Sequence, residues 1–266
     1  MVTAYDFPTA QVAQQCGVDM LLVGDSVGTN VLGLSDVSQV TMRDMEHHVK
    51  AVGRAAQESF VLADLPYHSY ETPRQALKNA ALLMTGKADG VKIEGEAEIV
   101  DIVRFLSGSN IPVCAHIGYT PQLSAGKPQV QGKDAQRARQ LISGALALQQ
   151  AGAFLIVLEL ITEQIAAAIT QTLTIPTIGI GSGPWCDGQV LVMHDLIGMT
   201  GKSFKHVKAF GSAREQLCQS ISDYAREVRQ GTFPTSANAS TIPPEEFAQI
   251  KKWLDEKGLT GNAQTP

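Results

Sequence analysis

The stretch Gly90-Val-Lys-Ile-Glu94 carries the pattern that decides the fold, a short apolar run that ends on an acid. Similar runs recur in Met20-Leu-Leu-Val-Gly-Asp25 and Phe60-Val-Leu-Ala-Asp-Leu65, with longer amphipathic stretches between them. Near-continuous hydrophobicity over the length of a strand is typical of strands buried on both faces of a parallel sheet. Eight runs fit this description: Val2–Tyr5, Met20–Asp25, Phe60–Leu65, Gly90–Glu94, Pro112–His116, Phe154–Glu159, Pro176–Ile180 and Val190–His194.

Strand-like runs that alternate with helical stretches predict a closed (β/α)8 TIM barrel, an α/β fold built as a single domain. The length of 266 residues suits this fold, which commonly takes about 250. An open doubly wound sheet is the alternative, because periodicity alone does not distinguish the two arrangements.

Helix start signals support the alternation. Thr72-Pro73 opens one helix, since Thr caps a helix and Pro suits its first turn, and a second helix is expected over Gln131–Gln150. A final helix over Arg214–Arg229 would complete the barrel domain, which we predict to span residues 1–232.

The segment after this domain has a different composition. Residues 233–266 contain several prolines among Ser, Thr and Asn, which predicts an extended C-terminal arm. Within this arm, Glu245–Lys257 is long enough to form a short helix.

Composition narrows the class of protein. Hydrophobic residues make up 44% and charged residues 18%, so a large core is expected and general disorder is not. The net charge of -5, without a block of like charges, does not favour binding to nucleic acid or to an anionic membrane. No apolar run approaches the roughly 18 residues of a membrane span, and no signal peptide is recognisable. Four well-separated cysteines without a CxxC pair fit the reducing cytoplasm.

Acids end three consecutive predicted strands. Asp25, Asp64 and Glu94 follow the second, third and fourth runs, which are neighbours in a barrel, and the carboxyl ends of barrel strands form the active site. Three carboxylates without a nearby Cys or His pair make a hard oxygen site that suits Mg2+. A 2-oxo acid could share that ion, which would act as a Lewis acid and stabilise an enolate.

Side-chain alternation directs the charges of the fourth run. Lys92 and Glu94 point to one face of the strand and Val91 and Ile93 to the other, so the charged pair is expected in the barrel mouth. Structural ion pairing of Lys92 and Glu94 is the simpler alternative, because buried charge needs a partner.

Enolate chemistry also needs a base for a carbon-bound proton. Glu159 ends the sixth run among apolar neighbours and is the candidate, although it could instead pair with a lysine or accept backbone hydrogen bonds. Lys92 could hold the substrate carboxylate or the enolate oxygen. His116 could do similar polar work or serve only as a structural group.

Two weaker signals lie in predicted loops. Ile178-Gly-Ile-Gly-Ser-Gly183 is similar to a phosphate-binding loop, but a tight turn is the preferred interpretation. Tyr67, His68 and Tyr70 follow Asp64 and would either line the substrate mouth or pack on it.

A set of motifs, in order along the chain, resembles the ketopantoate hydroxymethyltransferase family. Each block is modestly specific, whereas the ordered set is highly specific, and the likeness runs from Val2 to about Gly201 and more loosely to Pro234. The motifs are Val23-Gly-Asp-Ser26, Leu62-Ala-Asp-Leu-Pro66, Val91-Lys-Ile-Glu-Gly95, His116-Ile-Gly-Tyr-Thr-Pro-Gln122, Val130-Gln-Gly132, Leu158-Glu159, Ile178-Gly-Ile-Gly181 and Asp187-Gly-Gln-Val-Leu-Val-Met-His-Asp195.

The resemblance implies a role for each strand-end residue. It implies that Asp25, Asp64 and Glu94 are magnesium ligands and that Glu159 is the proton acceptor. The implied contacts to the oxo-acid substrate are Asp25, Ser26, Asp64 and Lys92, with His116 near the substrate.

The resemblance also implies the reaction and the assembly. A Mg2+-stabilised enolate of 3-methyl-2-oxobutanoate would attack the one-carbon unit of 5,10-methylenetetrahydrofolate, the co-substrate, to give 2-dehydropantoate on the route to pantothenate and coenzyme A. The implied partners are these small molecules and further copies of the chain, in a cytoplasmic homo-oligomer expected to be a homodecamer.

Three alternatives stay open at this point. Another Mg2+-dependent barrel of the phosphoenolpyruvate mutase and isocitrate lyase group would also form an enolate from a 2-oxo acid. Lys92 could act through a Schiff base, which borohydride would trap. A catalytically silent barrel would bind an oxo acid without turnover.

Overall fold

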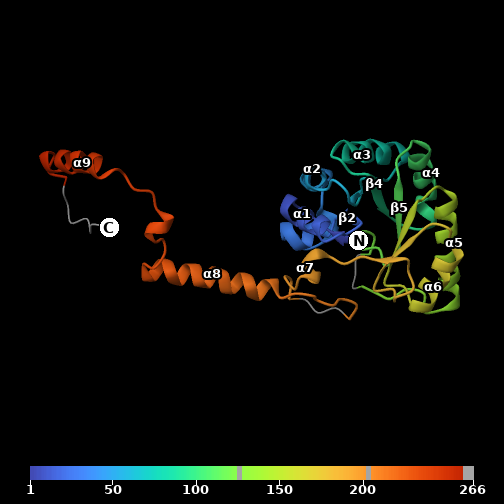
Figure 1. Ribbon diagram of the computed structural model, residues 1–266. Coiled ribbons are helices and arrows are strands. Elements are labelled where there is room, and N and C mark those ends of the chain that lie inside the picture. Colours follow the sequence, from blue (N-terminus) through green and yellow to red (C-terminus); the bar gives the residue numbers. More distant parts are fainter. Residues whose placement is uncertain (125–127, 202–204, 260–266) are drawn as a thin grey trace. The chain divides into compact units, whose positions relative to one another are not determined.

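The computed structural model describes residues 1–124, 128–201 and 205–259. Eight parallel strands form one sheet in the order β1 to β8, with helices packed on its outside (Figure 1). The strands are β1 Val2–Thr3, β2 Met20–Val23, β3 Phe60–Asp64, β4 Gly90–Glu94, β5 Val113–Gly118, β6 Leu155–Glu159, β7 Thr177–Ile180 and β8 Gly188–Gln189.

The sheet closes on itself just beyond β8. Val2 forms an isolated parallel bridge with Leu191, and the backbone N–H of Thr3 donates to the carbonyl of Leu191 at 3.1 Å. Every strand therefore has a neighbour on each side, which is the (β/α)8 barrel that the sequence predicts, rather than an open doubly wound sheet.

Helices follow most of the strands and form the outer layer. Thr72 caps α3 by accepting the N–H of Gln75 at 3.2 Å, as predicted from Thr72-Pro73. The helices of the barrel are α1 Phe7–Gln15, α2 Met42–Ala55, α3 Pro73–Thr85, α4 Val100–Gly108, α5 Ala135–Gln150, α6 Glu163–Thr172 and the short α7 Met193–Leu196. Shorter turns η1 Gly28–Leu32, η2 Val37–Gln39 and η3 Ala97–Ile99 lie in the loops.

Two boundaries differ from the sequence prediction. The α5 helix begins at Ala135 rather than Gln131, because the Asp134 carboxylate caps it by accepting the N–H of Arg137 at 2.8 Å. The prediction of a strand over Val190–His194 was wrong. The strand β8 lies just before it, and the chain turns into α7 at Met193, whose N–H donates to the Thr3 hydroxyl at 2.9 Å.

The apolar residues divide into two layers, as side-chain alternation requires. Val91 and Ile93 belong to the large core between strands and helices. A smaller core fills the barrel interior and consists of Leu22, Leu62, Cys114, Leu155, Val157, Ile178 and Val190. The charged residues of the barrel mouth rest on this inner layer.

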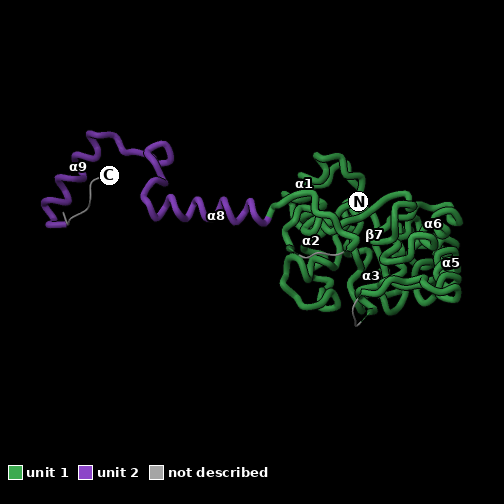
Figure 2. Tube along the Cα trace, turned by 90° about the horizontal axis from the view of Figure 1, so that it is seen from below, with its two compact units in different colours: residues 1–213 green, residues 214–266 purple. Residues whose placement is uncertain are grey.

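Contacts within the chain define two compact units, Met1–Ala213 and Arg214–Pro266 (Figure 2). The second unit contains α9 Pro244–Glu256, the turn η4 Ser236–Asn238 and nearly all of α8, which spans Ala213–Gln230. The predicted division into residues 1–232 and 233–266 stays a prediction, and residues 260–266 of the predicted arm lie outside the described residues. Among the described residues, no helix has the length and apolar character needed to cross a membrane.

Candidate active site

The polar residues predicted from the strand ends meet in one cavity of about 130 Å3. Parallel register brings them together, since Asp64 pairs with Lys92 across β3 and β4, and Glu94 pairs with His116 across β4 and β5. The residues of this cavity that the sequence singled out are Asp25, Ser26, Asp64, Lys92, Glu94, His116 and Glu159.

Lys92 is the central cation of the cavity. Its Nζ lies 3.0 Å from Asp64 Oδ1 and 3.6 Å from Glu94 Oε1, and all three side chains are buried. Burial by itself lowers the pKa of Lys92, but the surrounding carboxylates outweigh it and raise that pKa well above the ordinary value. The ion pairs expected from the simpler interpretation are therefore present, and a protonated amine held in this way is not the free nucleophile that a Schiff base requires.

Backbone N–H groups from neighbouring segments hold one oxygen of Asp64 and one oxygen of Glu94. Asp64 Oδ2 accepts the backbone N–H of Asp25 at 3.0 Å, and Glu94 Oε2 accepts the backbone N–H of Gln122 at 3.0 Å. The other oxygen of Asp64 is buried and lies 3.0 Å from Lys92 Nζ. Burial, followed by the charges of Asp64 and Glu94, raises the pKa of Asp25 well above its ordinary value.

These observations test whether the cluster fits a divalent cation. In the described parts of the chain, no three His, Cys, Asp or Glu side chains converge as a ready metal site. Lys92 Nζ lies between the carboxylates of Asp64 and Glu94 in this conformation. The donor set nevertheless fits, because three buried carboxylates line one cavity, and burial and the charges of Asp64 and Glu94 raise the pKa of Asp25. Hard oxygen ligands of this kind suit a divalent cation.

His116 connects the acid cluster to the candidate base. Its Nδ1 lies 2.9 Å from Glu94 Oε1, and its Nε2 lies 3.1 Å from Glu159 Oε2. Burial and Lys92 each lower the pKa of His116, but Glu94 and Glu159 outweigh them and raise it to about 9. His116 is thus a buried bridge between two carboxylates.

Glu159 has a different environment from the other acids. Its side chain is 18% exposed, whereas those of Asp64 and Glu94 are 1% exposed. It also lines a second, adjoining cavity of about 270 Å3. Gly118 permits the close packing of this end of β6, because a Cβ there would lie 2.3 Å from the carbonyl oxygen of Glu159.

Ser26 reaches the cavity from the segment that follows β2. Its hydroxyl lies 2.8 Å from the hydroxyl of the buried Tyr5, and either group can donate. Tyr5 therefore limits the orientations open to Ser26, which leaves the serine suited to a single polar contact with a ligand.

Gln122 is a site residue that the sequence did not single out. It is 4% exposed and lies in the loop after β5. Its side-chain Nε2 donates to Asp25 Oδ2 at 2.8 Å and to the carbonyl of Leu65 at 3.1 Å. The block that ends at Gln122 was recognisable in the sequence, but no spacing rule places a loop amide between two strand ends.

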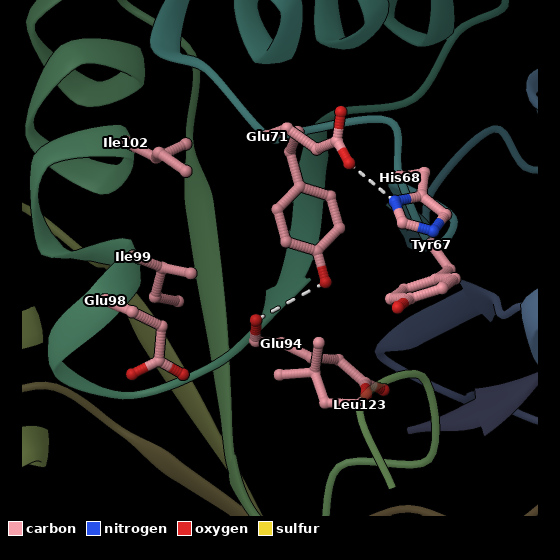
Figure 3. Close-up of a pocket in the computed structure, with 9 residues that line it drawn as sticks. Tyr67, His68, Glu71, Glu94, Glu98, Ile99, Ile102 and Leu123 are labelled. Atoms are coloured by element: carbon pink, nitrogen blue, oxygen red, sulfur yellow. Dashed lines mark hydrogen bonds and ion pairs between the residues drawn. The ribbon is translucent and has the colours of Figure 1, made fainter. Parts of the chain in front are cut away.

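The loop residues Tyr67, His68 and Tyr70 line a neighbouring cavity of about 290 Å3 (Figure 3). His68 Nδ1 lies 2.6 Å from Glu71 Oε1. Figure 3 shows this contact as a dashed line, with Glu94 at the boundary of the cavity. The glycine segment forms a tight turn, with φ of +65° at Gly181 and +83° at Gly183, and both residues border an open cleft of about 920 Å3.

A closed (β/α)8 barrel with an acidic site at the carboxyl ends of its strands is the architecture of TIM-barrel enzymes. Solved structures share this fold. One is 2,3-dimethylmalate lyase, a member of the PEP mutase/isocitrate lyase superfamily, with a TM-score of 0.58 and 16% identity over 98% of this chain and 92% of that chain. Phosphonopyruvate hydrolase gives a TM-score of 0.60 and 12% identity over 97% of this chain and 91% of that chain.

The particular family follows from sequence similarity. The family model described as ketopantoate hydroxymethyltransferase matches residues 1–236, and the chain belongs to this family. A 3-methyl-2-oxobutanoate hydroxymethyltransferase of Thermoanaerobacter sp. (strain X514) is 45% identical over 92% of this chain and 91% of that protein. The protein of the same name from Geobacillus kaustophilus (strain HTA426) is 45% identical over 94% of this chain and 91% of that protein. A mutase or lyase of the phosphoenolpyruvate mutase and isocitrate lyase group and a silent barrel are therefore not favoured.

Proposed function

We propose that the protein transfers the one-carbon unit of 5,10-methylenetetrahydrofolate to 3-methyl-2-oxobutanoate as a hydroxymethyl group. Water supplies the hydroxyl oxygen, and the products are 2-dehydropantoate and tetrahydrofolate. The observation that carries the proposal is the buried cluster of Asp25, Asp64, Lys92 and Glu94, with Glu159 reaching the same cavity. The name shared by the relatives supplies the substrates. The product belongs to the synthesis of pantothenate and coenzyme A.

The acid cluster would hold the cation and the oxo acid. Asp25, Asp64 and Glu94 are the proposed Mg2+ ligands, and a bound Mg2+ ion supplies Lewis-acid polarisation of the 2-oxo group. Lys92 offers its ammonium group to the substrate oxygens, which carry negative charge in the ground state and more of it after proton loss.

Glu159 is the proposed base for the C3 proton of the oxo acid. A carboxylate at the open side of the cavity can approach a carbon that the acid cluster does not cover. His116 touches Glu159 Oε2 and would hold the carboxylate in place during the transfer. Ser26 and Asp25 complete the proposed contacts to the oxo acid.

The second substrate would arrive through the larger outer cavity. Glu159 lines both that cavity and the inner one, so a folate held outside would bring its methylene group to the carbon that Glu159 deprotonates. Reacting atoms must come within about 3–3.5 Å of each other. The proposal therefore requires that the two cavities connect beside Glu159.

The proposed active form is a cytoplasmic homo-oligomer. The α8 helix exposes Leu217, Ile221, Tyr224 and Val228, which lie three or four residues apart and therefore on one face. An apolar stripe of this kind fits burial against a second copy of the chain. The family resemblance suggests a decamer, and light scattering of the full chain would measure its mass.

NMR spectroscopy of 3-methyl-2-oxobutanoate in D2O tests the reaction directly. With enzyme, Mg2+ and 5,10-methylenetetrahydrofolate, we expect loss of the C3 proton and formation of 2-dehydropantoate. A chelator should abolish both changes and an excess of Mg2+ should restore them. Folded, metal-loaded protein that produces neither change would refute the proposal.

A further inference from the structure

Gln122 is a loop residue that contacts two of the strand-end acids, one through its side chain and one through its backbone. Its side-chain amide donates to Asp25 Oδ2 at 2.8 Å, while its backbone N–H donates to Glu94 Oε2 at 3.0 Å. Asp25 follows β2 and Glu94 ends β4, so one residue ties together acids that the sheet separates by a strand.

The surrounding acceptors determine the orientation of this amide. Nε2 faces the Asp25 carboxylate and the carbonyl of Leu65, and both groups can only accept a hydrogen bond. Oε1 must then accept, and the hydroxyl of Tyr70 donates to it at 2.6 Å. A flipped amide would place its oxygen against the carboxylate.

Tyr70 is well placed to keep that orientation. It is 7% exposed, and burial raises the pKa of its hydroxyl out of the ordinary range, so the group stays protonated and able to donate. Its hydroxyl also lies 3.4 Å from the carbonyl of Glu94. Tyr70 therefore contacts both the amide and the backbone of one acid.

The charge of the amide also matters. A second lysine could fix Asp25 equally well, but its positive charge would oppose the binding of a cation. The neutral amide fixes the acids and leaves their negative charge in place. Groups of this kind, which orient metal ligands without touching the metal, commonly change metal affinity by 10–100-fold when they are mutated.

We propose that Gln122 is a positioning residue that holds Asp25 and Glu94 in the arrangement a divalent cation requires, and that Tyr70 fixes its amide. The proposal rests on the metal site of the proposed function, but it makes a separate statement about how that site is organised. It predicts that cation affinity depends on two side chains that donate no ligand atom.

Direct titration with Mn2+, in the absence of substrates, tests this proposal. Gln122→Met keeps the backbone N–H and much of the side-chain volume but removes the amide, and we expect Mn2+ affinity to fall by about 10–100-fold. Tyr70→Phe removes one neutral donor and should lower affinity by about fivefold. Electron paramagnetic resonance of free Mn2+ measures both without turnover.

Two matched variants control for changes in the same region. Tyr67→Phe removes a hydroxyl from a tyrosine that lines the neighbouring cavity but lies outside the Gln122 hydrogen bonds. Leu123→Ala alters the adjacent position of the same loop, where Figure 3 shows the side chain bordering that cavity. Both should bind Mn2+ within twofold of the parent protein.

The outcomes separate the two proposals. Folded Gln122→Met with parental Mn2+ affinity would overturn the positioning role. If that variant does not fold, Tyr70→Phe decides, and parental affinity in it is equally adverse. A parent protein that makes 2-dehydropantoate but does not bind Mn2+ refutes the positioning role alone. A parent that binds Mn2+, with both variants weakened, but makes no product supports the positioning role and refutes the proposed function.

If Gln122 had only a structural role, its substitution would lower stability without changing the Mg2+ concentration needed for turnover. For Gln122→Met we expect the Mg2+ concentration that gives half-maximal turnover to rise by at least tenfold. The KM for the folate should change by less than twofold. An equal rise in both values would count against the proposal.

Discussion

The two ends of the barrel strands use polar side chains in opposite ways. At the amino ends, Asp89 Oδ2 accepts the N–H of Val61 at 2.8 Å, and the Ser59 hydroxyl donates to the carbonyl of Val18 at 2.7 Å. At the carboxyl ends, Asp25, Asp64 and Glu94 crowd one another around a single lysine.

The difference lies in how the charges are compensated. Each amino-end group described above has a neutral backbone partner, which is how a barrel satisfies buried polar atoms and gains stability. The carboxyl-end acids instead raise the pKa of Asp25 through burial and mutual repulsion. Burying these acids lowers the stability of the fold unless a cation or ligand compensates their charge. Such an arrangement is typical of a functional site.

The largest expected effect is on the proposed base. Glu159→Gln keeps the shape of the side chain but removes the group that accepts a proton, so kcat should fall by about 1000-fold. Mn2+ affinity should stay near the parental value, because Glu159 is not a proposed ligand. Rapid-quench turnover and Mn2+ titration measure the two quantities.

An acid at the other end of the barrel provides the control for this change. Glu58 lies two residues before β3 and is exposed, so Glu58→Gln should leave kcat unchanged. Near-parental turnover in Glu159→Gln would show that Glu159 is not the base. It would also remove the proposed functional difference between Glu159 and the buried acid cluster.

The position of these acids was largely predictable from sequence. Side-chain alternation placed Lys92 and Glu94 in the barrel mouth, and it placed Val91 and Ile93 in the outer core. This was predictable because successive side chains of a strand point to opposite faces, whatever the rest of the fold. Gln122 was not predictable, since hydrogen bonds from other segments fix it.

The end of the barrel was misjudged for a related reason. The apolar run Val190–His194 has the composition of a strand, but its ladder ends where Met193 bonds to the Thr3 side chain and α7 begins. That contact joins residues 190 positions apart, and periodicity within the run contains no information about it. Long-range hydrogen bonds therefore decided these two points, whereas the local cap at Asp134 set the start of α5.

The second prediction compares matched aspartates at the two ends. Asp64 and Asp89 each accept one backbone N–H from another segment, at 3.0 Å and 2.8 Å. Asp64→Asn should weaken Mg2+ binding by about 100-fold, because it neutralises a proposed ligand. Asp89→Asn should leave Mg2+ affinity unchanged while lowering the free energy of unfolding by about 1–3 kcal/mol.

Calorimetry with Mg2+ and urea unfolding measure the two effects on both variants. Unchanged Mg2+ affinity in Asp64→Asn would exclude it as a ligand. Weakened Mg2+ binding in Asp89→Asn would show that the two ends of the barrel are not functionally separate.

The smallest expected effect concerns two serines that also occupy opposite ends. Ser26→Ala removes a neutral hydroxyl from the cavity, one that Tyr5 orients from 2.8 Å, and should raise the KM for the oxo acid by about fivefold with little change in kcat. Ser59→Ala removes a buried hydroxyl that donates to a backbone carbonyl, so it should lower stability by about 1 kcal/mol and leave KM unchanged. Steady-state kinetics and thermal unfolding of both variants give the comparison. If Ser26→Ala lowered stability but not substrate affinity, its hydroxyl would belong with the structural groups of the amino end, and the substrate contacts would reduce to the charged cluster alone.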